Sequence, residues 1–203
     1  MRILKMFPGS INERYMSEIT AALEDGKIIL YPTDTMYAIG CDALNSRAIE
    51  KICSIKGIDP RKNRLSILCA NISQAARYAK IDNLAFSILK DNLPGKFTFI
   101  LPAATTLPKQ FKGRHEVGIR VPDCDISRAI AEALGRPLLT TSVRTEEDID
   151  FIIPEEIADI YKPAGVEITV DSGEQHIEES TIVDITNPRD PQVIRQGAGQ
   201  LKI

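Results

Sequence analysis

The sequence predicts an α/β fold, a single domain over residues 1–203 with a twisted mixed sheet and flanking helices. Short apolar runs of strand length alternate with amphipathic stretches of helix length through most of the 203 residues. Strand-like runs then crowd together near the C-terminal end, which favours a mixed sheet over a purely parallel one. No segment rich in Pro, Gly or Ser divides the chain, so one domain fits better than two.

The first elements follow from apolar spacing and from helix caps. Residues 12–25 carry apolar side chains on one helical face, and Gly26 follows as a typical helix stop. The apolar run 28–30 predicts a buried strand. Ser46 is expected to cap a helix that ends near Gly57. The next predicted elements are a strand, two helices and two strands, over residues 65–69, 72–78, 84–89, 97–101 and 117–121.

The second half of the chain continues this pattern and ends in strands. A helix is predicted to start at Asp125 and to end before Gly135, and Pro154 is expected to open a short helix over 155–161. The segment 187–191 contains two prolines and reads as a turn, so the strands on either side of it are expected to form an antiparallel hairpin. The predicted strands of this half cover residues 138–141, 168–171, 181–185 and 193–195.

Composition excludes several classes of protein. A net charge of −3 argues against broad, nonspecific nucleic-acid binding, although it allows a local basic groove. The four cysteines are scattered without a CxxC pair, so we expect reduced structural thiols and no metal site. No apolar run approaches the length of a membrane span, and no secretion signal is evident, so a cytoplasmic protein without membrane contact is expected.

The most informative stretch is Tyr31-Pro32-Thr33-Asp34-Thr35, which directly follows the predicted strand 28–30. It presents hydroxyls and a carboxylate beyond a strand end, where ligands bind in open α/β sheets. A turn braced by an Asx-type bond from Asp34 explains the same residues about equally well when the stretch is taken alone.

Cations and hydroxyls recur at other predicted strand ends and suit a polyanion such as a nucleoside triphosphate. Arg120 stands out because it lies within an apolar strand, where an arginine is costly unless it has a partner or a ligand. Neither GxxxxGK[ST] nor GxGxxG occurs, which excludes a P-loop and a Rossmann site on motif grounds.

The order of these motifs resembles the YrdC-like family, whose best-known members are threonylcarbamoyl-AMP synthases. Departures from the usual motifs make the chain look most like the YciO branch of that family. The resemblance spans nearly the whole chain and implies the YrdC-like fold with a concave basic face. The residues that carry it are 31–37, Lys56-Gly57, 94–98, 118–122, Thr141-Ser142, 180–184 and 194–197.

The resemblance implies a nucleotidyltransferase that joins L-threonine, bicarbonate and ATP into threonylcarbamoyl-AMP and pyrophosphate, for the t6A modification of tRNA. Mg²⁺ would be carried on the phosphates, and tRNA-modification proteins would be partners. By resemblance, Thr33 and Arg120 would hold threonine, with Ser180 nearby. The residues facing ATP would be Lys56, Arg61, Arg64, Thr98, Ser142 and Arg195.

Two departures fall in the implied ATP site. Ile58 occupies the position of a family arginine, for which Arg61 or Arg64 are the candidate substitutes, and Arg144 occupies the position of a family asparagine. Acidic residues 146–148 replace a glycine-rich segment. Two alternatives therefore stay open: a protein that binds tRNA or double-stranded RNA without robust synthase activity, and a related carbamoyl- or adenylyl-transferring enzyme with another acceptor.

Overall fold

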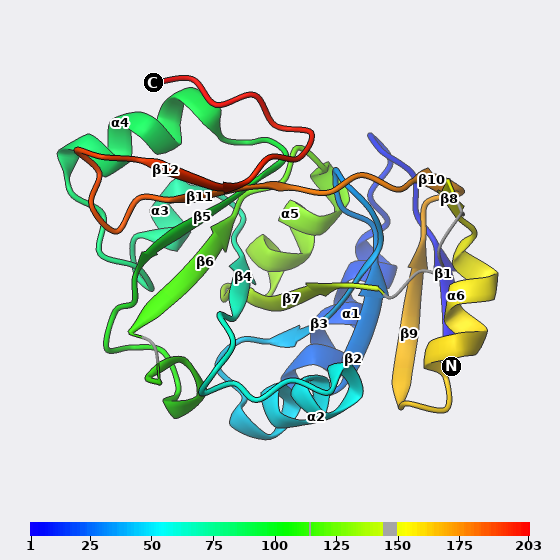
Figure 1. Cartoon of the computed structure of the whole chain (residues 1–203). Coiled ribbons are helices and arrows are strands. Elements are labelled where there is room, and N and C mark those ends of the chain that lie inside the picture. Colours follow the sequence, from blue (N-terminus) through cyan, green and yellow to red (C-terminus); the bar gives the residue numbers. More distant parts are fainter. Residues whose placement is uncertain (114, 144–149) are drawn as a thin grey trace.

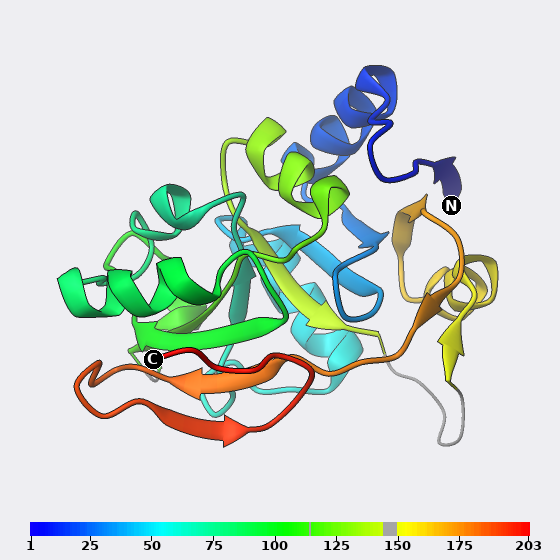
Figure 2. The ribbon, with the colours of Figure 1, turned by 90° about the horizontal axis from the view of Figure 1, so that it is seen from above.

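A ten-stranded mixed sheet runs through the computed structural model, which describes residues 1–113, 115–143 and 150–203. The strand order is β1-β9-β2-β3-β7-β4-β6-β5-β11-β12, and a separate two-stranded sheet pairs β10 with β8. Parallel pairs (β1 with β9, β9 with β2, β4 with β6, β5 with β11) occur together with antiparallel ones, so the sheet is mixed as predicted. Figures 1 and 2 show the sheet twisting strongly, with helices on its outside.

The strands are β1 (Arg2–Lys5), β2 (Ile28–Tyr31), β3 (Ala38–Asp42), β4 (Ser66–Leu68), β5 (Phe97–Pro102), β6 (Glu116–Arg120), β7 (Leu138–Ser142), β8 (Phe151–Ile152), β9 (Val166–Asp171), β10 (Gln175–His176), β11 (Thr181–Asp184) and β12 (Gln192–Arg195). The helices are α1 (Glu13–Glu24), α2 (Ser46–Lys56), α3 (Ile72–Ala75), α4 (Asn83–Asn92), α5 (Asp125–Ala133), α6 (Pro154–Tyr161) and the 3₁₀ turn η1 (Lys109–Phe111). No helix among these described residues is long and apolar enough to cross a membrane.

Two apolar clusters hold the sheet and the helices together. The larger one gathers buried side chains of α2, α4 and α6 with those of the sheet, including Ile52, Leu89 and Ile157. The smaller one combines α1 and α5 with the sheet, through residues such as Leu23 and Ile130. Burial of this apolar surface is the main favourable contribution to folding.

The predicted elements are present, with differences at their ends. The second helix is capped by Asn45 rather than Ser46, because the Asn45 side chain accepts hydrogen bonds from two backbone amides of the first turn. The helix predicted over 72–78 ends at Ala75, and the one predicted over 84–89 extends to Asn92. The C-terminal antiparallel hairpin, β11 with β12, is confirmed.

Two strands of the large sheet were not predicted. β1 is a short edge strand with mostly exposed residues, so it lacks an apolar run. β3 is buried at all five positions and therefore shows no alternation of apolar and polar residues. β3 pairs with β2, which places the stretch 32–37 in the connection of a hairpin.

Candidate functional site

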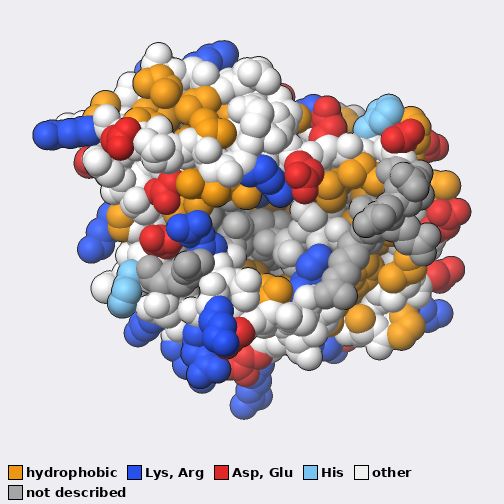
Figure 3. Space-filling model, viewed as in Figure 1, with side chains coloured by type: hydrophobic (Ala, Val, Ile, Leu, Met, Phe, Trp, Pro, Cys, Tyr) orange, Lys and Arg blue, Asp and Glu red, His pale blue; other side chains and the backbone are white. Residues whose placement is uncertain are grey.

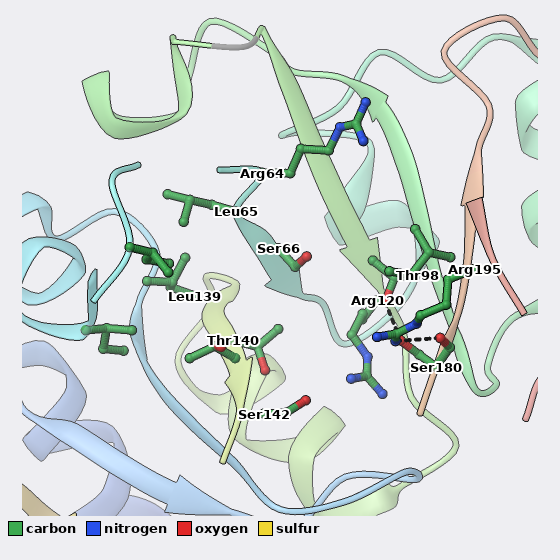
Figure 4. Close-up of a pocket in the computed structure, with 14 residues that line it drawn as sticks. Arg64, Leu65, Ser66, Thr98, Arg120, Leu139, Thr140, Ser142, Ser180 and Arg195 are labelled. Carbon is green, nitrogen blue, oxygen red and sulfur yellow. Dashed lines mark hydrogen bonds between the residues drawn. The ribbon is translucent and has the colours of Figure 1, made fainter. Parts of the chain in front are cut away.

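One pocket collects most of the polar residues that the sequence singles out. The face turned towards the viewer in Figure 1 is hollowed near its centre, with Lys and Arg side chains at the rim (Figure 3). Figure 4 shows side chains from several strands and from the segments beside them around this hollow. The lining residues are Ile52, Ile58, Arg64, Leu65, Ser66, Thr98, Arg120, Leu139, Thr140, Thr141, Ser142, Ser180, Ile182 and Arg195.

The floor of the pocket is built on Gly118. Ser66 of β4 pairs with Thr140 of β7 on one side and with Gly118 of β6 on the other. A Cβ atom at position 118 would overlap Ser66 Oγ and would lie 3.1 Å from Thr98 Cγ2. Glycine is therefore the residue that leaves room for these hydroxyl-bearing side chains at the floor.

Arg120 is buried in this pocket with an acidic partner on one side only. It is 6% exposed, and its Nη2 donates to Asp34 Oδ1 at 3.0 Å and to Thr35 Oγ1 at 2.9 Å. Its Nε is buried and has no hydrogen-bond partner among the described residues. The expectation that this arginine needs a partner is met by Asp34, while the unpartnered Nε leaves it suited to bind an anionic ligand as well.

The hairpin connection 32–37 presents Asp34, and Thr33 braces it. Thr33 Oγ1 accepts from the backbone amides of Thr35 and Met36 and donates to the Met36 carbonyl at 2.7 Å. The alternative explanation, an Asx-type bond from Asp34, is not found among the described residues, because the Asp34 carboxylate accepts hydrogen bonds from Arg120 and from the backbone amide of Asp123. Thr33 is 2% exposed and lies outside the lining of the Arg120 pocket.

Ser180, Thr98 and Arg195 form a hydrogen-bonded group on the opposite wall (Figure 4). The hydroxyls of Thr98 and Ser180 lie 2.9 Å apart. Arg195 Nη2 donates to the Ser180 carbonyl at 2.7 Å, and its Nη1 contacts Glu179 at 3.0 Å. Arg195 Nε, like that of Arg120, is buried without a partner among the described residues. This wall thus offers a second guanidinium and two hydroxyls to a ligand.

The structure separates the two arginines that could substitute at the Ile58 position. Arg64 and Ile58 line the same pocket, and acidic side chains flank Arg64, since its Nε contacts Glu116 at 2.7 Å and its Nη2 lies 3.8 Å from Asp184. Arg61 lies outside the pocket lining, and its largely exposed side chain pairs with Asp59. Of the two, Arg64 is therefore the cation placed to meet a ligand.

Lys56 and Ser142 meet at the end of α2 and β7. Lys56 Nζ donates to the Ser142 carbonyl at 2.6 Å, and the Ser142 hydroxyl belongs to the pocket lining. The sequence departures that follow this strand, Arg144 and the acidic residues 146–148, lie outside the described residues.

The described residues indicate neither a reactive cysteine nor a metal site. Burial raises the pKa of the Cys41, Cys53 and Cys69 thiols, which disfavours the reactive thiolate. Cys41 is fully buried and does not line the pocket. Within the described part of the chain, no group of three or more His, Cys, Asp or Glu side chains could hold a metal ion. The donor set of the pocket, guanidinium groups and hydroxyls, matches anionic oxygen atoms instead.

Sequence reasoning missed part of this site. The sequence predicts that the Asp34 carboxylate faces a ligand, but it does not reveal that Asp34 pairs with an arginine 86 residues away. Gly118 lies within a motif that carries the family resemblance and Ser66 lies outside these motifs, and the sequence marks neither residue as part of a pocket floor. Thr140 belongs to the predicted strand 138–141, and nothing in the sequence assigns it a role.

Comparison with other proteins gives a consistent picture. A family model for the Sua5, YciO and YrdC proteins, described as "Telomere recombination", matches residues 21–197. The uncharacterized protein YciO of Escherichia coli (strain K12) is 34% identical, over 96% of this chain and 95% of that protein. The threonylcarbamoyl-AMP synthase of Vibrio vulnificus (strain YJ016) is 27% identical, over 90% of this chain and 98% of that protein.

Solved structures agree in fold. The crystal structure of E. coli YciO superposes with a TM-score of 0.88 at 32% identity and covers 98% of both chains. The crystal structure of P. abyssi Sua5 complexed with L-threonine gives a TM-score of 0.86 at 27% identity, covering 97% of this chain and 58% of that one. The predicted α/β architecture is thereby confirmed.

Proposed function

Because this chain belongs to the family of Sua5, YciO and YrdC proteins, we propose that it is an ATP-dependent L-threonylcarbamoyladenylate synthase. The observation that carries the proposal is Arg120, a buried guanidinium held by Asp34 on one side and unpartnered at Nε within a pocket of hydroxyls and further arginines. Relatives named as synthases of this type, and a Sua5 structure complexed with L-threonine, support the substrate assignment.

In this proposal the threonine carboxylate binds at Arg120, with the Ser180 hydroxyl close by. The amino group of threonine adds to the carbon of bicarbonate, and loss of water yields a carbamate. A carbamate oxygen then attacks the α-phosphorus of ATP, and pyrophosphate leaves with the bonding electrons. This chemistry depends on positioning and charge neutralisation more than on a nucleophilic side chain, which matches the residues of the pocket.

ATP is proposed to extend across the pocket from the Ser142 side towards Arg64 and Arg195. Arginine binds phosphate oxygens as a planar fork, and serine and threonine hydroxyls fill the remaining acceptor positions. Mg²⁺ would be carried by the phosphates and would neutralise part of their charge, since the pocket offers cations and hydroxyls rather than carboxylate ligands. Thr33 acts in this scheme by bracing the turn that presents Asp34 to Arg120.

The product would serve the t6A modification of tRNA, with the proteins of that pathway as partners. Direct binding of tRNA or double-stranded RNA is the second candidate for this chain. Glu116 and Glu179 neutralise part of the charge of Arg64 and Arg195, so this face offers little net positive charge to a long polyanion, and a small ligand such as a nucleotide is favoured in the pocket.

The test is pyrophosphate release from ATP by the purified chain, with and without L-threonine and bicarbonate. We expect release only when both are present, and no release from Arg120→Met under the same conditions. Release that ignores L-threonine would contradict the assigned acceptor, and it would favour a related adenylyl-transferring enzyme. Absence of release together with salt-dependent RNA binding would favour the second candidate.

A further inference from the structure

A fully buried tyrosine lies directly behind the pocket wall. Tyr31 is 0% exposed and ends β2, two strands away from β7, where Thr140 lies. Its hydroxyl nevertheless reaches Thr140 Oγ1 at a distance of 2.7 Å. Thr140 is 6% exposed and lines the pocket, so this hydrogen bond joins the protein interior to the binding surface.

Gly40 makes this reach across β3 sterically allowed. Gly40 pairs with Thr140 on one side and with Ile29 on the other, so it lies in the path of the tyrosine side chain. A Cβ atom at position 40 would lie 2.8 Å from Tyr31 Cε1 and 3.0 Å from the Tyr31 hydroxyl oxygen. The glycine therefore makes room for the tyrosine, and the two residues act as one structural unit.

The direction of the hydrogen bond follows from what each hydroxyl can reach. Among the described residues Tyr31 has no second hydrogen-bond partner, so its hydrogen would be buried and unpaired if Thr140 were the donor. Such an unpaired buried group is costly. With Tyr31 as donor, the Thr140 hydrogen is free to turn into the pocket. Burial raises the pKa of Tyr31 far above its ordinary value, which keeps the phenol protonated and able to donate.

Thr140 and Arg120 both line the pocket, and Figure 4 shows both side chains around the same hollow. Burial raises the pKa of Tyr31, and the positive charge of Arg120 lowers it by a smaller amount. The Thr140 hydroxyl therefore shares a pocket with the oxygen-bearing group that Arg120 would bind, and under the proposed function that group belongs to the amino-acid substrate.

We propose that Tyr31 is a positioning residue: by donating to Thr140 Oγ1, it fixes the Thr140 hydroxyl as a hydrogen-bond donor to an oxygen of bound L-threonine. The inference rests on the proposed function and adds a residue that touches no substrate itself. Removing the tyrosine hydroxyl leaves the Thr140 hydroxyl without its donor and free to rotate, so the substrate loses an oriented donor.

The experiment is calorimetric titration of the full chain with L-threonine, using Tyr31→Phe, Thr140→Val and the double variant. Because a neutral hydrogen bond contributes modestly, we expect each single variant to bind about threefold to tenfold more weakly. The double variant should bind no more weakly than Thr140→Val, since Tyr31 acts through Thr140. Thr140→Ser keeps the hydroxyl and should retain the affinity.

Tyr37→Phe is the matched control, because Tyr37 is also fully buried and its hydroxyl binds Ser172 and Gly173 outside the pocket. It should lower the melting temperature while leaving L-threonine affinity unchanged. If the unmodified chain binds L-threonine and Tyr31→Phe binds it equally well, this inference alone is overturned. A further loss from Tyr31→Phe in the Thr140→Val background would also overturn it. If the unmodified chain does not bind L-threonine, the proposed function fails, and the inference falls with it.

Discussion

Neutralising Asp34 tests the physical reasoning about the pocket most directly. The Asp34 and Arg120 side chains are 3% and 7% exposed, and they meet at 3.0 Å. Asp34→Asn removes the carboxylate charge but keeps an oxygen that can accept a hydrogen bond from Arg120. The guanidinium therefore loses its negative partner but can keep its position. Breaking a buried ion pair in this way costs about 3 to 5 kcal/mol. We expect the lower end, about 3 kcal/mol, because one acceptor remains.

The size of this effect makes it measurable by equilibrium urea unfolding or by thermal melting. For a chain of this length, about 3 kcal/mol corresponds to a melting temperature roughly 6 to 12 °C lower. Arg120→Met should cost a similar amount because it leaves Asp34 buried without its partner. The double variant replaces the pair by uncharged groups, and its cost should be smaller than the sum of the two single costs by at least about 2 kcal/mol.

A matched control is the exposed pair of Arg195 with Glu179, whose side chains are 39% and 59% exposed. Glu179→Gln should change the free energy of unfolding by less than about 1 kcal/mol, because exposed pairs are screened by solvent. If the losses in unfolding free energy caused by Asp34→Asn and Arg120→Met are additive in the double variant, the two side chains do not stabilise each other as a buried pair. None of the Arg120 variants should regain L-threonine binding, even where stability recovers.

Three further outcomes are expected. Arg64→Ala should raise the KM for ATP severalfold in the pyrophosphate assay and Arg61→Ala should leave it nearly unchanged; equal effects would show that lining the pocket is not what matters. Gly118→Ala should suppress turnover and destabilise the fold by about 1 to 3 kcal/mol, because the added methyl group overpacks the floor, and an active, stable variant would contradict that geometry. Burial raises the pKa of Tyr37 to about 12, so the folded state holds this proton more tightly than the unfolded state, and stability should fall as the pH rises from about 10 to about 12. Urea unfolding across that range should show a shallower fall for Tyr37→Phe, and identical slopes would contradict the assignment.

The fold was predictable from the sequence wherever local signals and final structure agree. The run 28–30 is apolar and lies in a fully buried strand, and Gly57 adopts the left-handed conformation that ends a helix. β3 escaped prediction because its burial comes from pairing with β2 and β7, strands on both sides of it, and not from a recognisable pattern of its own. Secondary structure that depends on distant partners leaves a weak trace in the local sequence.

For the candidate site, too, some residues could be predicted from the sequence and others could not. Arg120 drew attention because an arginine in an apolar strand requires a partner. Which acid provides that partner depends on the tertiary structure: the connection after β2 reaches the end of β6 although β3, β7 and β4 lie between these strands in the sheet, and neither composition nor spacing reveals this. The different positions of Arg64 and Arg61 also depend on the tertiary structure. The two arginines are three residues apart in one loop, yet only Arg64 lines the pocket, whereas Arg61 pairs with Asp59.

The position of β11 in the sheet has a consequence for how the protein is made. β11 pairs with β5, although more than 80 residues separate them, and it brings Ser180 and then Arg195 to a wall whose other residues were synthesised much earlier. During translation the nascent chain can complete β4, β6 and β7 while this wall is still missing. Substrate therefore cannot assist early folding, and a ribosome that stops before residue 180 releases a chain with Arg120 in place but without the residues that enclose it.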